Sequence, residues 1–282
     1  MKQNADVLYH YCSLEAFLSI IQNASLRLSD ISKSNDNQEC IYARDKVKQG
    51  VEQLLEQNSE WLKSWNFGYS LNSDINKDMV TYVACFSEKK DLLSQWRGYA
   101  VDGKGIAIGF SKKILQILNE INSYVISFQK VIYDLDEQDI YINKIVDEVV
   151  ESIELKSIGH VALELNTNYK LKYPVCKNSG FKEEAEWRII FNSGPGQGKI
   201  YTNKGVDFSE VKYRVARDKL VSYMEMDFSK IKQDIIKEIW IGPKAQVSKV
   251  DVMEILACYG YYNEPYNIET PILISNSECP YC

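Results

Sequence analysis

The first third of the chain alternates between strand-like and helix-like spacing of apolar residues. Residues 5–12 (ADVLYHYC) are rich in β-formers and alternate in the manner of a strand with two different faces. Residues 14–23 have apolar positions at helical spacing, and Ser13 before them is a good helix N-cap. The nearly continuous apolar run at 79–86 predicts a strand that is buried on both faces.

The remaining segments follow the same two patterns. Helices are predicted over about 38–58, 111–121, 136–172 and 245–258. Strands are predicted over 105–110, 124–133, 186–192, 210–216, 220–226, 235–243 and 271–275. Helices gather in the first two thirds, strands gather towards the end, and no Pro/Gly/Ser-rich linker separates two halves. The pattern predicts a single α+β domain over 1–282, with a central mixed or antiparallel sheet flanked by helices.

Composition narrows the classes of partner. The chain is 45% hydrophobic, which is typical of a globular protein, and no apolar run approaches the roughly 18 residues that span a bilayer. The first dozen residues lack the apolar stretch of a signal peptide, so we expect a cytoplasmic protein without a membrane partner. The net charge of −6 disfavours binding to extended nucleic acid, whereas a small anionic ligand held by a few cations remains compatible.

Two motifs resemble functional sites only superficially. SGPGQGK (193–199) lacks the Gly-Lys-Ser/Thr ending and the following helix of a phosphate-binding loop, so we expect it to connect two strands as a hairpin. Cys279 and Cys282 have the spacing of a redox pair, but no helix can follow them to lower a thiol pKa. The role of this pair is left open. The odd number of cysteines, 7, also argues against a complete disulfide framework.

The segment FKEEAEWRIIF carries charged residues at alternate positions. Glu184, Glu186 and Arg188 would share one face if this segment is a strand. A solvated charged face is the simplest explanation, yet the apolar residues that follow indicate a central strand. A carboxylate at the start of a buried strand is costly unless it is paired or functional. Glu186 is therefore a candidate functional residue, with Arg188 as its ion-pair partner or as a contact for an anion.

A second polar segment precedes the predicted strand at 105–110. It concentrates aromatic, cationic and hydrogen-bonding side chains, namely Ser94, Gln95, Trp96, Arg97 and Tyr99. Such a combination suits a flat, charged ligand. The alternative is that Trp96 and Tyr99 pack in the core while Arg97 lies on the surface.

Taken in order, seven motifs resemble the bacterial domain-of-unknown-function family DUF2971. They are YHYCS, SND followed by Glu39, YVACFSE, SQWRGYA, GKGIAIGF, FKEEAEWR and IWIGP. The resemblance is specific because several of these motifs carry the rare residue tryptophan. The usual family ending has an Arg after Pro-Tyr, whereas Cys282 stands there in this chain.

The family is in turn distantly similar to ADP-ribosyltransferase-like proteins. This similarity implies an ADP-ribosyltransferase-like fold, and it implies that the protein consumes NAD as a substrate. The order of residue types in that larger group maps onto His10, Tyr99 and Glu186 as catalytic residues. The resemblance implies cofactor contacts from Trp96, Arg97, Arg188 and Ser13. Glu186 would stabilise the positive charge that develops on the ribose when nicotinamide leaves. Tyr99 and Trp96 would stack on nicotinamide, His10 would hydrogen-bond the adenosine ribose, and no metal is needed.

Three functions follow from these residues. The first is an NAD-consuming ADP-ribosyltransferase-like enzyme, or an NAD glycohydrolase, acting on a protein, nucleic-acid or small-molecule acceptor in bacterial defence. The second is a metal-dependent nuclease or phosphodiesterase, with a ligand set of Asp36, Glu39, Glu184 and Glu186. The third is a non-catalytic module that binds a nucleotide-like small molecule. The acceptor and the pathway are not determined by the sequence.

Overall fold

The computed structural model of the chain describes residues 6–33, 43, 45–46, 49–50, 53, 80–121, 125–155, 172–194, 196–216, 219–262 and 272–281. The helix expected at 38–58 lies mostly outside the described residues, as do the second half of the segment 136–172, Cys282, and the loop residues Asn35, Asp36 and Glu39. None of the described helices is long and apolar enough to cross a membrane.

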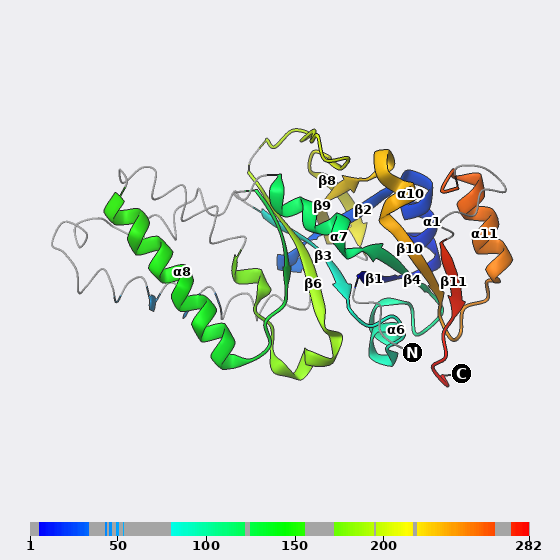
Figure 1. Cartoon of the computed structure of the whole chain (residues 1–282), viewed down its shortest axis with the longest axis horizontal. Helices are drawn as coiled ribbons and strands as arrows, with labels where there is room; N and C mark the ends of the chain where they lie inside the picture. Colours follow the sequence, from blue (N-terminus) through cyan, green and yellow to red (C-terminus); the bar gives the residue numbers. More distant parts are fainter. Residues whose placement is uncertain are drawn as a thin grey trace.

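The described residues form an α+β fold around one extended sheet (Figure 1). Its strands are β1 (Val7–Cys12), β2 (Ser25–Asp30), β3 (Val80–Ser87), β4 (Ile106–Ser111), β5 (Ile126–Lys130), β6 (Glu186–Ser193), β7 (Asp207–Phe208), β8 (Lys212–Ala216), β9 (Lys219–Asp227), β10 (Ile236–Ile241) and β11 (Leu273–Asn276). The main path runs β11-β10-β4-β1-β3-β2-β9-β7. Only the β10–β11 pair is parallel among these strands, so the sheet is mixed, as predicted.

The helices are α1 (Leu14–Asn23), α6 (Leu93–Tyr99), α7 (Lys112–Gln116), α8 (Leu135–Leu155), α10 (Lys232–Ile235) and α11 (Lys249–Cys258). The predicted caps are confirmed: Ser13 accepts a hydrogen bond from the amide of Ala16 at 3.1 Å, and Ser111 caps α7. The helix predicted at 111–121 is shorter, because it tightens into a 3₁₀ turn at Ile117–Glu120. Figure 1 shows α8, in green, extending away from the sheet.

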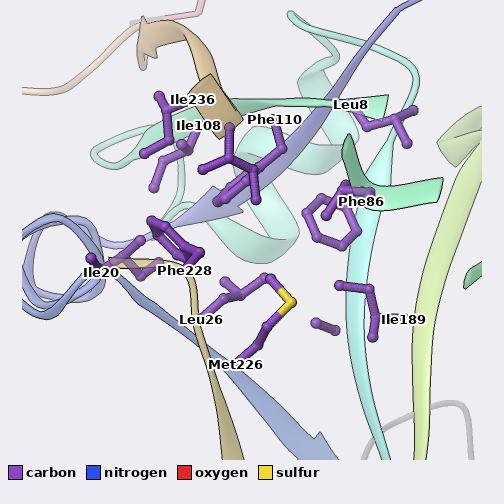
Figure 2. Packing of buried hydrophobic residues seen from close by; sticks show 14 of the residues in the cluster. Leu8, Ile20, Leu26, Phe86, Ile108, Phe110, Ile189, Met226, Phe228 and Ile236 are labelled. Carbon is purple, nitrogen blue, oxygen red and sulfur yellow. The ribbon is translucent and has the colours of Figure 1, made fainter. Parts of the chain in front are cut away.

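The two faces of β1 bury different groups, as the alternation predicts. Leu8 and Cys12 belong to the large core between the sheet and α1, α7 and α11, where Phe86, Phe110 and Phe228 also pack (Figure 2). The opposite face buries a smaller cluster that contains Tyr9, Tyr11 and, from α6, Trp96. Helix α6 is thereby fixed against β1 on the face opposite the main core.

Strand β3 divides the sheet. One edge of β3 pairs with β6 over its whole length, from Val80 to Ser87. Its other edge is shared: β2 pairs with residues 82–83, whereas β1 reaches it only where Tyr9 meets Ser87. Strands β1 and β3 therefore part near Cys85, and the ladder between them is incomplete.

Two expectations about chain geometry are wrong. The strand predicted at 186–192 is confirmed as β6, but Ser179–Glu184 before it form a 3₁₀ helix, which ends where Ala185 takes a left-handed conformation (φ 45°). Glu184 and Glu186 are therefore not alternate residues of one strand. The glycine-rich loop after β6 is not a hairpin turn, because β7 pairs with β9 and not with β6.

Candidate functional site

A small pocket lies where β1 and β3 part, next to α6 and the start of β6. Its volume is about 60 Å³, which accommodates a few water molecules or a few polar groups of similar size. His10, Tyr99 and Glu186 all line it, although they come from β1, α6 and β6. The structure therefore brings the three residues of the predicted catalytic set to one place.

His10 occupies the gap in the ladder. Its Nδ1 lies 2.9 Å from the carbonyl oxygen of Cys85. Burial lowers the pKa of His10 below its usual value, so the ring is neutral in neutral solution. Because a carbonyl can only accept, Nδ1 carries the proton and Nε2 is left as a hydrogen-bond acceptor. The pocket thus contains an uncharged imidazole with a defined tautomer.

Helix α6 contributes two side chains one turn apart, Gln95 and Tyr99. Gln95 is buried, whereas Tyr99 is half exposed and forms the rim. The hydroxyl of Tyr99 lies 3.4 Å from Oε1 of Glu184, which is a long and weak hydrogen bond. The pocket is therefore open to solvent on the side of Tyr99.

Glu186 is the centre of a buried ion-pair cluster. The guanidinium of Arg188 binds it through both oxygens, with Nε at 2.7 Å from Oε1 and Nη2 at 3.0 Å from Oε2. Lys177 donates to Oε2 at 2.9 Å, and the thiol of Cys85 also hydrogen-bonds the carboxylate. Burial alone would raise the pKa of Glu186, but Arg188 and Lys177 outweigh it and hold the pKa at about 2. Glu186 is ionised and fully paired.

Lys177 joins the two carboxylates of the pocket. Its ammonium lies 2.7 Å from Oε2 of Glu184 as well as 2.9 Å from Glu186. Within the described part of the chain, two cations, Lys177 and Arg188, thus face two carboxylates. All four side chains are buried, which is tolerable only because they neutralise one another.

The backbone around the cluster is held by neighbouring elements. The amide of Gln138 in α8 donates to the carbonyls of both Ile132 and Lys177, each at 2.8 Å. The hydroxyl of Tyr133 accepts the backbone N–H of Glu186 at 3.0 Å. The hydroxyl of Ser87 donates to the carbonyl of Glu184 at 2.6 Å. These bonds fix both carboxylates before any ligand arrives.

The four residues expected to contact a cofactor do not line the pocket. Trp96 lies on the side of α6 that packs against β1, where it is completely buried and donates to Asp91. Its ring therefore has no face left for stacking on nicotinamide. Arg188 is 1% exposed and engaged by Glu186 and the carbonyl of Pro174, so it cannot reach a pyrophosphate. Arg97 is exposed and lies near the ring of Tyr281, whereas Ser13 is the cap of α1.

Sequence reasoning missed Lys177, and it named Gln95 as part of a polar segment suited to a ligand without giving that residue a role of its own. Lys177 stands in the segment VCKNSG, where nothing in the pattern distinguishes it from a surface lysine. The described residues contain no group of three or more carboxylate, histidine or cysteine side chains that could hold a metal ion. Asp36 and Glu39, proposed for such a site, lie outside the described residues.

Comparison with protein-family models identifies a related family. The model of the family described as "Protein of unknown function (DUF2971)" matches residues 95–189. This match confirms the resemblance to DUF2971. The DUF2971 match includes Gln95, Tyr99, Lys177 and both pocket carboxylates, whereas His10 precedes it. No curated protein and no solved structure matches the chain.

Proposed function

We propose that the protein cleaves the bond between nicotinamide and ribose in NAD, as an ADP-ribosyltransferase-like enzyme or an NAD glycohydrolase. The observation that supports this function is that His10, Tyr99 and Glu186 line one pocket. In the reaction the C–N bond breaks and its electron pair leaves with nicotinamide. The oxygen of water, or a nucleophilic atom of an acceptor, bonds to C1′ and releases a proton.

Glu186 is the carboxylate assigned to the ribose. With a pKa of about 2 it is negative at every physiological pH, which suits electrostatic stabilisation of a cationic sugar but not proton transfer. Arg188 and Lys177 offset part of its charge and hold it in one position. The thiol of Cys85 is a weak donor, so a ribose hydroxyl can replace that contact at little cost.

The two remaining residues complete the contacts around the sugar. Tyr99 is half exposed at the rim, where its ring can stack on the nicotinamide as it leaves. His10 lies in the same pocket, so we assign its Nε2 to a hydroxyl of the nicotinamide ribose rather than to the adenosine ribose. The adenylate half of NAD is too large for a cavity of about 60 Å³ and would lie outside it.

The nuclease alternative has less support. Glu184 and Glu186 both bind Lys177, which occupies the place where a divalent cation would have to sit. A cation there would repel the buried ammonium and Arg188. The third alternative, a module that binds a nucleotide without cleaving it, would use the same pocket. The test below distinguishes it from an enzyme, because such a module binds NAD and releases no nicotinamide.

The test is nicotinamide release from NAD by the purified protein in the presence of EDTA. We expect release that EDTA does not affect, and a loss of about 100-fold in the variants Glu186→Gln and Tyr99→Ala. Glu225→Gln is the matched control, because Glu225 is also a carboxylate paired with two cations, Lys212 and Arg27, but it does not line the pocket. This control should release nicotinamide at a rate within about threefold of the wild type.

Thermal unfolding and NAD binding are measured on every variant. Tyr99→Ala removes a half-exposed side chain and should remain folded, so its activity reports on the site even if Glu186→Gln unfolds. Binding of NAD without release would make the protein a binding module. Absence of both release and binding, or full activity in Tyr99→Ala and folded Glu186→Gln, would overturn the proposal.

A further inference from the structure

Gln95 presents a side-chain amide to the pocket. Its side chain is 7% exposed and lines the pocket, and it makes no hydrogen bond with any of the described residues. The amide atoms reach solvent through the pocket, since the fully buried, unpartnered polar atoms among the described side chains are the hydroxyls of Ser94 and Ser127. A ligand whose polar groups match the amide can replace the water that would otherwise hydrogen-bond it. The amide of Gln95 is therefore available to hydrogen-bond a polar group of a ligand that enters the pocket.

The helix that carries Gln95 is held firmly. The indole of Trp96 donates to Asp91 at 2.6 Å, and the carbonyl of Trp96 accepts the amide of Gly103 at 2.9 Å. Trp96 and Ala100 are completely buried against β1. The adjacent position Gln95 consequently has a fixed direction towards the pocket, with Tyr99 one turn further along.

The charges of the pocket select the chemistry of its occupant. Among the described residues, the cations Lys177 and Arg188 pair with Glu184 and Glu186, and the other side chains of the lining are uncharged. An anionic group would lose its hydration there without gaining a cation of its own. A neutral group with both a donor and an acceptor is favoured, because the amide of Gln95 offers one of each.

We infer that Gln95 binds the carboxamide of nicotinamide and thereby determines specificity for that group. The Nε2 of Gln95 donates to the carboxamide oxygen, and its Oε1 accepts an N–H of the carboxamide nitrogen. This inference rests on the proposed function, since it places the leaving group of NAD in the pocket. In NAD, the carboxamide and one ribose hydroxyl share the cavity of about 60 Å³, and the nicotinamide ring lies at the rim beside Tyr99.

Nicotinic acid is the informative competitor. It has the same ring but a carboxylate in place of the carboxamide, so it cannot donate to Oε1 of Gln95 and it brings an uncompensated charge near Glu184. A site built to hydrogen-bond a ligand rejects an analogue that leaves its polar groups unpaired. We expect the wild type to bind nicotinamide at least about tenfold more tightly than nicotinic acid.

The experiment is titration calorimetry of the full chain with nicotinamide and with nicotinic acid. Gln95→Met keeps the shape of the side chain and removes both hydrogen bonds. It should weaken nicotinamide binding by about tenfold and leave nicotinic acid within about twofold. Ser94→Ala is the matched control on the same helix. The Ser94 hydroxyl is buried and has no partner among the described residues, and Ser94 does not line the pocket.

The outcomes separate this inference from the proposed function. A preference for nicotinamide that disappears in Gln95→Met and persists in Ser94→Ala supports the inference, whether or not NAD is cleaved. A wild type that binds neither compound, or an unchanged preference in folded Gln95→Met, overturns it. NAD cleavage in that second case would leave the proposed function standing and remove only the role of Gln95.

Discussion

The ammonium of Lys177 lies 2.9 Å from Oε2 of Glu186, and both side chains are almost completely buried. The two residues come from different elements, since Lys177 follows the 3₁₀ turn at Tyr173–Val175 and Glu186 begins β6. Their contact closes a cluster in which each charge has a partner. The stability of the fold and the geometry of the pocket therefore depend on the same ion pairs.

Lys177→Met should destabilise the protein by about 3–5 kcal/mol, because it leaves Glu184 and Glu186 buried with Arg188 as their remaining cation. Chemical denaturation measures the loss. Lys199→Met is the control, since Lys199 is exposed and lies 3.9 Å from Glu210, and its cost should be below about 1 kcal/mol. Equal costs for the two variants would contradict the structural role of Lys177.

Acid should weaken the fold through Glu186. Its pKa falls from 4.5 to about 2 on folding, so its ionisation contributes stability that is present above pH 4.5 and lost as pH falls towards 2. The difference corresponds to roughly 3 kcal/mol. Urea unfolding between pH 2 and 5 should show a shallower pH dependence for Glu186→Gln/Arg188→Met than for the wild type. Identical slopes would show that the pair does not control acid stability.

His10 should make stability depend on pH in a second range. Burial lowers its pKa in the folded state, so the unfolded chain binds the proton more tightly. Its contribution is present above pH 6.5 and is lost as pH falls through the folded pKa. Thermal unfolding between pH 5 and 7.5 should be flatter for His10→Asn than for the wild type. A dependence that survives this substitution would assign the effect to other groups.

Asp91 connects α6 to the C-terminal segment. It accepts hydrogen bonds from the indole of Trp96 and the hydroxyl of Ser277, both at 2.6 Å, and from the amide of Glu278 at 2.7 Å. Asp91→Ala should cost about 1–3 kcal/mol, because the buried indole N–H loses its acceptor. Asp147→Ala, on the exposed side of α8, should change stability by less than about 0.5 kcal/mol in thermal unfolding.

Replacing two glycines, Gly98 and Gly105, by alanine should change the stability of the fold in opposite directions. A Cβ at Gly98 meets no atom within 4 Å, so Gly98→Ala should stabilise α6 by about 0.5–1 kcal/mol. A Cβ at Gly105 would lie 2.0 Å from the carbonyl oxygen of Cys12, so Gly105→Ala should destabilise by about 1–3 kcal/mol. Denaturant midpoints give both signs, and a stabilised Gly105→Ala variant would refute the close approach of these chain segments.

Local patterns predicted much of the fold. The alternation in β1, the N-cap at Ser13 and the buried run of β3 follow from residue type and spacing, which depend on neighbours within a few positions. The possibility that Glu184 shares the strand of Glu186 is wrong for the same reason. A left-handed turn at Ala185 ends the 3₁₀ helix, and alanine carries no sequence signal for that conformation.

The sequence by itself determined the α+β class, most strand positions and the polar segments around Tyr99 and Glu186. Tertiary structure alone decided which of these segments meet. The pairing of β3 with three different strands leaves the gap that His10 occupies. The tertiary structure also places Lys177 between two carboxylates. It also buries Trp96 and leaves Gln95 facing the pocket. Such contacts join residues far apart in the chain, and their energies depend on burial and charge balance that no local pattern encodes.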